Sequence, residues 1–204
     1  MFGGIVRGSG TALRFPTHDD IAAIARWSAD GRVRRGGPRA LWHEPASLAT
    51  WKERFTEQAK DKASLLWSIE TREGAERPPR LVGAARCAFW PPPLGDSVSL
   101  SYFVIEPDDW GKGYGFDAAL ALHRYVFDYL HLRFAEVELP ADNDRALRLA
   151  QRLGYARYAH GHSVFYRDGG YADQYLMRLD LAVWDERFGE REREYAPLGA
   201  EAER

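Results

Sequence analysis

The stretch that decides the fold is Glu106-Pro107-Asp108-Asp109-Trp110-Gly111-Lys112-Gly113-Tyr114-Gly115-Phe116. It follows an apolar, strand-like run and precedes a long helical pattern, so its three glycines lie where a strand should become a helix. Glycine allows backbone angles and close approaches that a Cβ would block. The first turn of a helix presents free N–H groups and a partial positive charge, which together attract phosphate. We therefore expect this turn to bind a phosphate-bearing ligand.

The glycine spacing excludes two common phosphate-binding motifs. A P-loop needs two glycines separated by four residues and followed by Lys and Ser or Thr. Here Lys112 lies between glycines, and no Ser or Thr follows Gly115. The dinucleotide motif needs a third glycine three residues after the second, but those places hold Phe116 and Ala118. On spacing alone, a tight strand-to-helix turn that binds nothing remains the alternative.

Three segments of the chain, in this order, resemble the GNAT acetyltransferases. The opening 13–20 is similar to the first strand and helix cap of the family. The turn at 110–115 resembles its pyrophosphate-binding loop, most of all in the branch that acetylates the N-termini of ribosomal proteins. Asn143-Asp144-Arg145-Ala146, followed by Leu149 and Leu153-Gly154-Tyr155, is similar to its Asn-x-x-Ser/Ala…Leu-Gly-Phe segment. The resemblance extends over about 11–184.

The predicted elements indicate a mixed α+β fold, because strands alternate with helices but also form hairpins. Hydrophobic patterning predicts strands at 11–15, 65–71, 81–89, 97–105, 134–139, 156–166 and 171–181. Helices are expected after Thr17, after Ser47, from the glycine turn to about 130, and at 145–153. The resemblance implies the GNAT fold: a mostly antiparallel central sheet, helices on both faces, and a splayed parallel pair, 97–105 and 134–139.

One domain accounts for most of the chain. We expect a flexible N-terminus over 1–10, which holds four glycines, a GNAT domain over 11–184, and a charged tail over 185–204. The segment 31–40 is rich in glycine and arginine, and the resemblance implies that this region shapes the acceptor pocket. Its arginines favour an acidic peptide or an anionic small molecule as acceptor, or form a solvated loop.

Composition narrows the class of protein. The 204 residues are 45% hydrophobic with a net charge of −2, which predicts a globular chain without general nucleic-acid affinity. No apolar run reaches the roughly 20 residues that cross a membrane, and no signal peptide is expected. The single cysteine, Cys87, excludes an internal disulfide and is interpreted as a buried strand residue. We expect a cytoplasmic protein, as a monomer or a homodimer.

The resemblance implies acetyl-CoA as cosubstrate. Its pyrophosphate would lie against the turn, and its amide-bearing arm would pair with the strand edge at Val104 and Ile105, where a backbone N–H would polarise the thioester carbonyl. Asn143 is implied near the sulfur, or it caps the next helix. Arg148 and Arg152 would reach phosphates, or they are solvated helix residues. The residues expected at the pyrophosphate are Trp110, Gly111, Lys112, Gly113, Tyr114, Gly115 and Phe116.

The predicted reaction is attack of a neutral amine on the thioester. An α-amino group has a pKa near 7.7–8.0, so about a tenth or more is already neutral at pH 7. A lysine ε-amine has a pKa near 10.4, so reaching its neutral form at pH 7 without a base costs about 4.6 kcal/mol. An α-amine acceptor therefore demands less help from the protein.

The chain departs from the family where an acid and a base are expected. Ala150 stands at the place of the tyrosine acid, Ala146 at the place of a serine, and Ser99 at the place of a glutamate base. Glu106 and Glu138 are our candidates for relaying a proton through water, with surface carboxylates as the alternative. Tyr155 and Tyr158 are further candidates for the acid, with core or hairpin aromatics as the alternative.

We expect no metal. His160 and His162 lie two residues apart on a hairpin, and without a third ligand they are interpreted as polar strand residues. The predicted function is an acetyl-CoA-dependent N-acetyltransferase that modifies a protein N-terminus or a small-molecule amine in a ternary complex. The alternatives are a non-catalytic acyl-CoA-binding sensor and a GNAT enzyme that uses another acyl-CoA.

Overall fold

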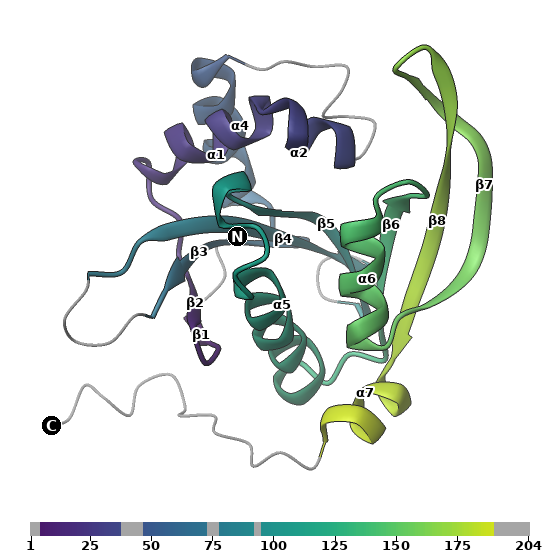
Figure 1. Cartoon of the computed structure of the whole chain (residues 1–204). Helices are drawn as coiled ribbons and strands as arrows, with labels where there is room; N and C mark the ends of the chain where they lie inside the picture. Colours follow the sequence, from purple (N-terminus) through teal and green to yellow (C-terminus); the bar gives the residue numbers. More distant parts are fainter. Residues whose placement is uncertain (1–4, 38–46, 73–77, 92–94, 190–204) are drawn as a thin grey trace, which may run out of the picture.

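One twisted sheet organises the computed structural model, which describes residues 5–37, 47–72, 78–91 and 95–189 (Figure 1). Within these ranges the strand order is β1-β2-β3-β4-β5-β6-β8-β7, and every neighbouring pair is antiparallel except β5–β6. The strands are β1 (Val6–Arg7), β2 (Thr11–Arg14), β3 (Ser64–Thr71), β4 (Leu81–Trp90), β5 (Ser97–Ile105), β6 (Phe134–Pro140), β7 (Ala156–Arg167) and β8 (Gly170–Asp180). The predicted mixed fold and its parallel pair are confirmed.

Helices cover both faces of the sheet, as predicted (Figure 1). On one face α5 (Tyr114–Arg124), continued by a π-helical turn (Tyr125–Tyr129), packs with α6 (Asp144–Leu153) and α7 (Leu181–Phe188) around Trp67 and Trp184. On the other face α1 (Asp20–Ala29), α2 (Gly31–Gly36) and α4 (Leu48–Lys60) pack around Trp27 and Phe55. No helix in the described ranges has the length and apolar character to cross a membrane.

Two expectations near the N-terminus differ from the structure. Residues 5–10 do not fray throughout, because Val6–Arg7 pairs with β2, and Asp117 of α5 accepts hydrogen bonds from Ser9 N (2.9 Å), Gly10 N (3.0 Å) and Thr11 Oγ1 (2.6 Å). The arginine-rich segment is not all loop: 31–36 form α2, whose first turn is capped by Asp30 accepting from Arg32 N at 2.8 Å. Residues 38–46 lie outside the described ranges.

The splay between β5 and β6 has a local cause. The parallel strands pair only from Ser97 to Ser99, against Phe134 to Glu136. Just beyond, β5 carries one extra residue, Ser101, because the register with β4 shifts between Arg86 and Cys87. A bulge bends its strand and strengthens the local twist. The second half of β5 therefore leaves β6 and opens the sheet.

Candidate active site

A cleft of about 690 Å³ lies where β5 and β6 separate. Its walls are the second half of β5, the end of β6, the glycine turn, one side of α6 and the end of α2. Most of the predicted cofactor residues line it: Val104, Ile105, Trp110, Gly111, Gly113, Gly115, Phe116, Asn143 and Arg148. Lys112 and Tyr114 are not among its lining residues. The fold thus brings together segments that are far apart in the sequence.

The glycine turn has the conformation that its sequence predicts. Gly111 and Gly113 have φ of +84° and +91°, a region that other L-residues enter only with strain. The N–H groups of Lys112 and Phe116 already bond to the carbonyls of Asp109 (3.4 Å) and Gly113 (3.1 Å). Those of Gly111, Gly113 and Gly115 have no acceptor among the described residues. The donors available in the turn therefore include the three glycines but not Lys112 or Phe116.

A buried carboxylate holds this turn in place. Asp109 accepts from both terminal nitrogens of Arg80, at 2.6 and 2.9 Å, and from Lys112 Nζ at 2.8 Å. The hydrogen bonds from Arg80 and then Lys112 lower the pKa of Asp109, against the opposing effect of burial. Lys112, whose side chain is 55% exposed, therefore helps to hold the turn through Asp109.

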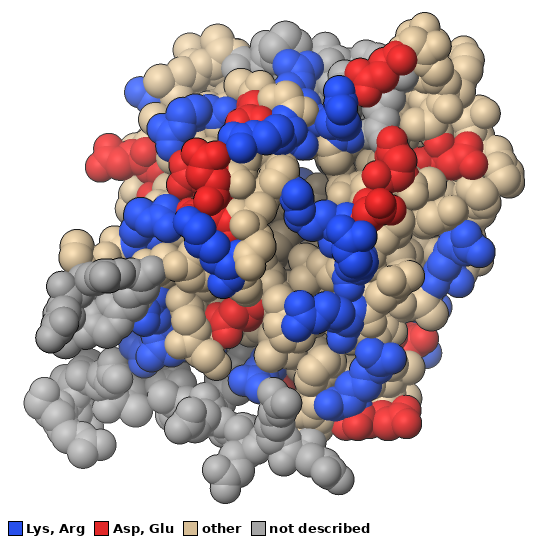
Figure 2. All heavy atoms as spheres, in the orientation of Figure 1, with Lys and Arg blue, Asp and Glu red and all other residues tan. Residues whose placement is uncertain are grey.

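Three arginines of α6 face the glycine turn. The guanidinium of Arg145 lies 3.6 Å from the ring centre of Trp110, and that of Arg152 lies 3.8 Å from the ring centre of Phe116. Arg148 lines the cleft between them. None of the three forms an ion pair within the described parts of the chain. Figure 2 shows basic side chains running beside the hollow in this face. Burial and then the charge of Arg148 lower the pKa of Arg145.

Sequence reasoning missed Arg145 as a cleft residue. The signal was available, because positions 145, 148 and 152 follow the i, i+3, i+7 spacing that aligns side chains on one helix face. Only Arg148 and Arg152 are predicted there from the sequence. A third cation beside the first two makes the anion-binding character of this helix face stronger.

Asn143 caps α6, which is the alternative that the sequence left open. Its Oδ1 accepts from Ala146 N at 3.1 Å, and its Nδ2 donates to the Gly36 carbonyl of α2 at 2.7 Å. The side chain therefore ties the two helices together across the cleft that it lines. Both its functional groups are used within the protein.

The strand edge at the cleft is offered by Ile105. Glu106 N–H donates to the Val82 carbonyl of β4 at 2.7 Å. Since hydrogen-bonding sides alternate along a strand, Val104 N–H is directed to β4 as well, and Ile105 N–H to the side from which β6 has departed. The Ile105 carbonyl already accepts from Trp110 Nε1 at 2.8 Å. Of the two residues proposed for the thioester contact, Ile105 has the suitable orientation.

The two candidate bases occupy different environments. Glu138 is exposed, lines the cleft and accepts from Gln174 Nε2 at 2.6 Å. Glu106 is absent from the cleft lining and pairs with Arg80 at 3.3 Å and Arg26 at 3.6 Å. Glu138 is therefore the candidate that a substrate in the cleft could reach.

Neither tyrosine that we considered is poised as an exposed acid. Tyr158 is half exposed and does not line the cleft. Tyr155 lines its floor but is buried, and burial raises its pKa well above the ordinary value. Its hydroxyl lies 2.6 Å from Nε2 of His123, whose Nδ1 lies 2.7 Å from the Ala119 carbonyl. A carbonyl can only accept, so neutral His123 carries its proton on Nδ1 and accepts from Tyr155.

This pair predicts a pH-dependent stability. Burial lowers the pKa of His123 to about 4, from an ordinary 6.5. Below pH 6.5 His123 is protonated in the unfolded chain but stays neutral in the folded chain. The free energy of unfolding therefore decreases as the pH is lowered from about 6.5 to about 4, by up to about 3 kcal/mol. Urea unfolding across this range measures the loss. The double variant His123→Leu/Tyr155→Phe, which leaves no partner unsatisfied, should lose correspondingly less. If the unfolding free energies of the double variant and the unmodified protein had the same pH dependence, His123 would not be the group responsible.

Comparisons with known proteins agree with this geometry. A family model described as an acetyltransferase (GNAT) domain matches residues 11–156. No curated protein matches the chain. A spermidine N-acetyltransferase from Vibrio cholerae, solved with CoA and spermine, has 19% identity, covers 85% of this chain and 97% of its own, and gives a TM-score of 0.72. A GNAT-family acetyltransferase from Bacillus anthracis has 16% identity, with coverage of 88% and 99% and a TM-score of 0.71.

The likeness to the two solved structures shows a shared fold. The family match is more decisive, since it covers well over half of the chain and contains the glycine turn, the splayed strands and α6. This chain belongs to the GNAT family of acetyltransferases.

Proposed function

We propose that this protein transfers an acetyl group from acetyl-CoA to a primary amine bound in the same cleft. The observation that carries the proposal is the convergence, at one end of an opened sheet, of N–H groups and guanidinium groups that have no acceptor among the described residues. Anions bind where helix N-termini and arginines meet, and the pyrophosphate of CoA is such an anion. Arg145, Arg148 and Arg152 supply the charges, and Gly111, Gly113 and Gly115 the backbone donors.

The remaining groups fit the rest of the reaction. The arm of CoA carries amides, and the unpaired edge of β5 can bind them as it would a peptide. Ile105 N–H is the donor that would polarise the thioester carbonyl. Glu138, at the opposite wall, would take the proton of the attacking amine directly or through one water. Asn143 would act mainly by positioning α6 against α2.

The acceptor is a primary amine of one of two kinds. The sequence resembles the branch that modifies ribosomal-protein N-termini, which favours an α-amine. The similar Vibrio cholerae structure contains spermine, which favours a polyamine. The arginines of α2 carry less free charge than their number suggests, because Arg32 pairs with Asp30 (2.8 Å) and Asp108 (3.0 Å), and Arg35 with Asp168 (3.6 Å).

Release of free CoA tests the proposal. Acetyl-CoA would be incubated with the protein and either a peptide with a free N-terminus, the same peptide acetylated at its N-terminus, or spermidine. A thiol reagent reports the product. Cys87 does not contribute to the signal, because it is buried and burial raises its pKa to about 12. We expect release with at least one free amine and none with the blocked peptide.

The same assay separates the alternatives. A protein that binds acetyl-CoA but releases none with any amine would be a binding module, and the transferase proposal would fail. A faster reaction with propionyl-CoA or succinyl-CoA than with acetyl-CoA would indicate another acyl donor. Ala150 stands where the resemblance implies a tyrosine acid, so the test between a transferase and a binding module is informative.

A further inference from the structure

We propose that His160, His162 and Asp173 form a binding site for a first-row divalent metal ion, with Zn²⁺ as the best match. The two histidines come from β7 and the aspartate from β8, on the long hairpin that rises past α6 toward α2 (Figure 1). The sequence offered only the two histidines. The antiparallel pairing of β7 with β8 supplies the third ligand, which is thirteen and eleven residues away in the chain.

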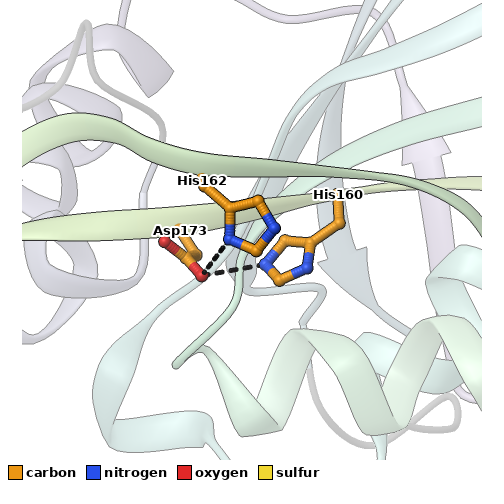
Figure 3. A group of neighbouring side chains, drawn as sticks. All are labelled: His160, His162 and Asp173. Atoms are coloured by element: carbon orange, nitrogen blue, oxygen red, sulfur yellow. Dashed lines mark hydrogen bonds and ion pairs between the residues drawn. The ribbon is translucent and has the colours of Figure 1, made fainter.

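The three side chains already converge on one point. His160 Nε2 lies 2.9 Å and His162 Nδ1 lies 3.3 Å from the same oxygen, Oδ2 of Asp173 (Figure 3). Zinc bonds of 2.0–2.2 Å in a tetrahedral site put neighbouring ligand atoms about 3.3 Å apart. All three ligand atoms lie within 4.8 Å of one another. An ion would therefore take the place of the two protons that lie between the histidine nitrogens and Oδ2 of Asp173. The rings would need to move only slightly.

A strained bulge aims the ligands. The pairing register of β7 with β8 shifts between Gly161 and Phe165, and Ser163 has φ of +52°. Oδ1 of Asp173 accepts from Ser163 N at 2.9 Å, which fixes the carboxylate and leaves Oδ2 for the two histidines. The ring of His160 packs edge-on against Tyr175, with 4.8 Å between ring centres. Asp173 and His160 are thus held in place by contacts that leave Oδ2 and Nε2 available to a metal ion.

The ligand set selects the class of metal. Two imidazoles and one carboxylate suit zinc, nickel, copper or cobalt, whereas magnesium and calcium prefer oxygen ligands alone. Side-chain exposures of 74% for His162 and 36% for Asp173 leave the outer side of the site open to water or another ligand. Such a site would cross-link the two strands of the hairpin at their bulge.

The site adjoins the wall of the cleft that contains Glu138. Asp173 precedes Gln174, which donates to Glu138, and the Asp173 carbonyl accepts from Ala141 N at 2.9 Å. A metal that fixes the bulge would also fix the strand that holds Glu138. All three ligands lie on the hairpin, so the metal site would exist whether or not the proposed reaction takes place.

Calorimetric titration of the full-length, untagged protein with Zn²⁺, after treatment with a chelator, tests this site. We expect saturable binding of one ion per chain and a rise in Tm that grows with Zn²⁺ concentration. Replacing an outer-shell group near a metal typically costs 10–100-fold in affinity, so losing a ligand should cost at least about tenfold. The variants are His160→Gln, His162→Gln and Asp173→Asn, the last of which keeps an acceptor for Ser163 N–H.

The matched control is His131→Asn, which removes an exposed histidine that lies outside both strands of the hairpin. Its φ of +54° is one that asparagine tolerates, so the fold should be unaffected. The control should bind Zn²⁺ as the unmodified protein does. Absence of saturable binding in the folded protein would overturn the proposal. So would equal affinity in a His160→Gln/His162→Gln double variant whose Tm without metal is unchanged.

Discussion

Replacing Gly113 with alanine is expected to weaken acetyl-CoA binding by about a hundredfold or more while leaving the chain folded. An alanine held at the Gly113 φ of +91° destabilises the turn by about 1–2 kcal/mol. The turn either keeps this strained conformation or changes it, which rotates its N–H groups away from the cleft. A hydrogen bond to a charged group contributes about 1.5–3 kcal/mol, so losing two corresponds to at least two decades in affinity. Calorimetric titration with acetyl-CoA measures the change.

Gly169 provides a matched control for this variant. It lies at the tip of the β7–β8 hairpin with φ of +86°, and a Cβ added at either glycine meets no other atom within 4 Å. Gly113→Ala and Gly169→Ala therefore impose similar backbone strain and should lower Tm by similar amounts. Only the first should lose affinity for acetyl-CoA. Equal affinities in the two variants would mean that the glycine turn does not hold the cosubstrate.

Replacing Glu138 with glutamine is expected to lower kcat about a hundredfold for an amine of high pKa, because general-base catalysis typically contributes 10²–10⁴-fold. Glutamine cannot take a proton, yet its carbonyl can still accept from Gln174 Nε2, so the cleft wall should keep its shape. Affinity for acetyl-CoA should be unchanged. Steady-state release of CoA measures kcat, and the loss should be smaller for an α-amine, which is partly neutral without help.

Glu106→Gln is the matched comparison. Glu106 was an equal candidate from the sequence, but it faces Arg80 and Arg26 outside the cleft lining. Its replacement should change kcat little, although the weakened pairing can lower Tm slightly. If both variants kept full activity, the amine would lose its proton to bulk water and not to a carboxylate. If Glu106→Gln were the slower enzyme, our assignment of the base would be wrong.

The sequence predicted the local features of this fold well. Gly111 and Gly113 have left-handed backbone angles, with φ of +84° and +91°, at the turn that the glycine pattern indicated. The predicted β7–β8 hairpin, the cap at Ser47 and the burial of Cys87 are confirmed. These features depend on a few neighbouring residues, whose conformational preferences are strong.

Features that depend on distant partners were not predictable in the same way. Helix α2 has six residues, too few for a hydrophobic period, and it follows α1 directly because Asp30 caps its first turn. The salt bridge of Lys112 to Asp109, a carboxylate that also accepts from Arg80, was not predicted from the sequence either. The third member of the His160–His162 cluster comes from the neighbouring strand, so no spacing along the chain reveals it.

Calorimetric titration of the purified, folded protein with acetyl-CoA tests the central claim most directly. We predict saturable binding at one site per chain. Its affinity should fall as the salt concentration rises, because in the proposed complex Arg145, Arg148 and Arg152 would face the phosphates. Desulfo-CoA, which lacks the thioester but keeps the phosphates, should compete for the same site. A folded protein that binds neither compound would contradict the account of the cleft and of the function proposed for it.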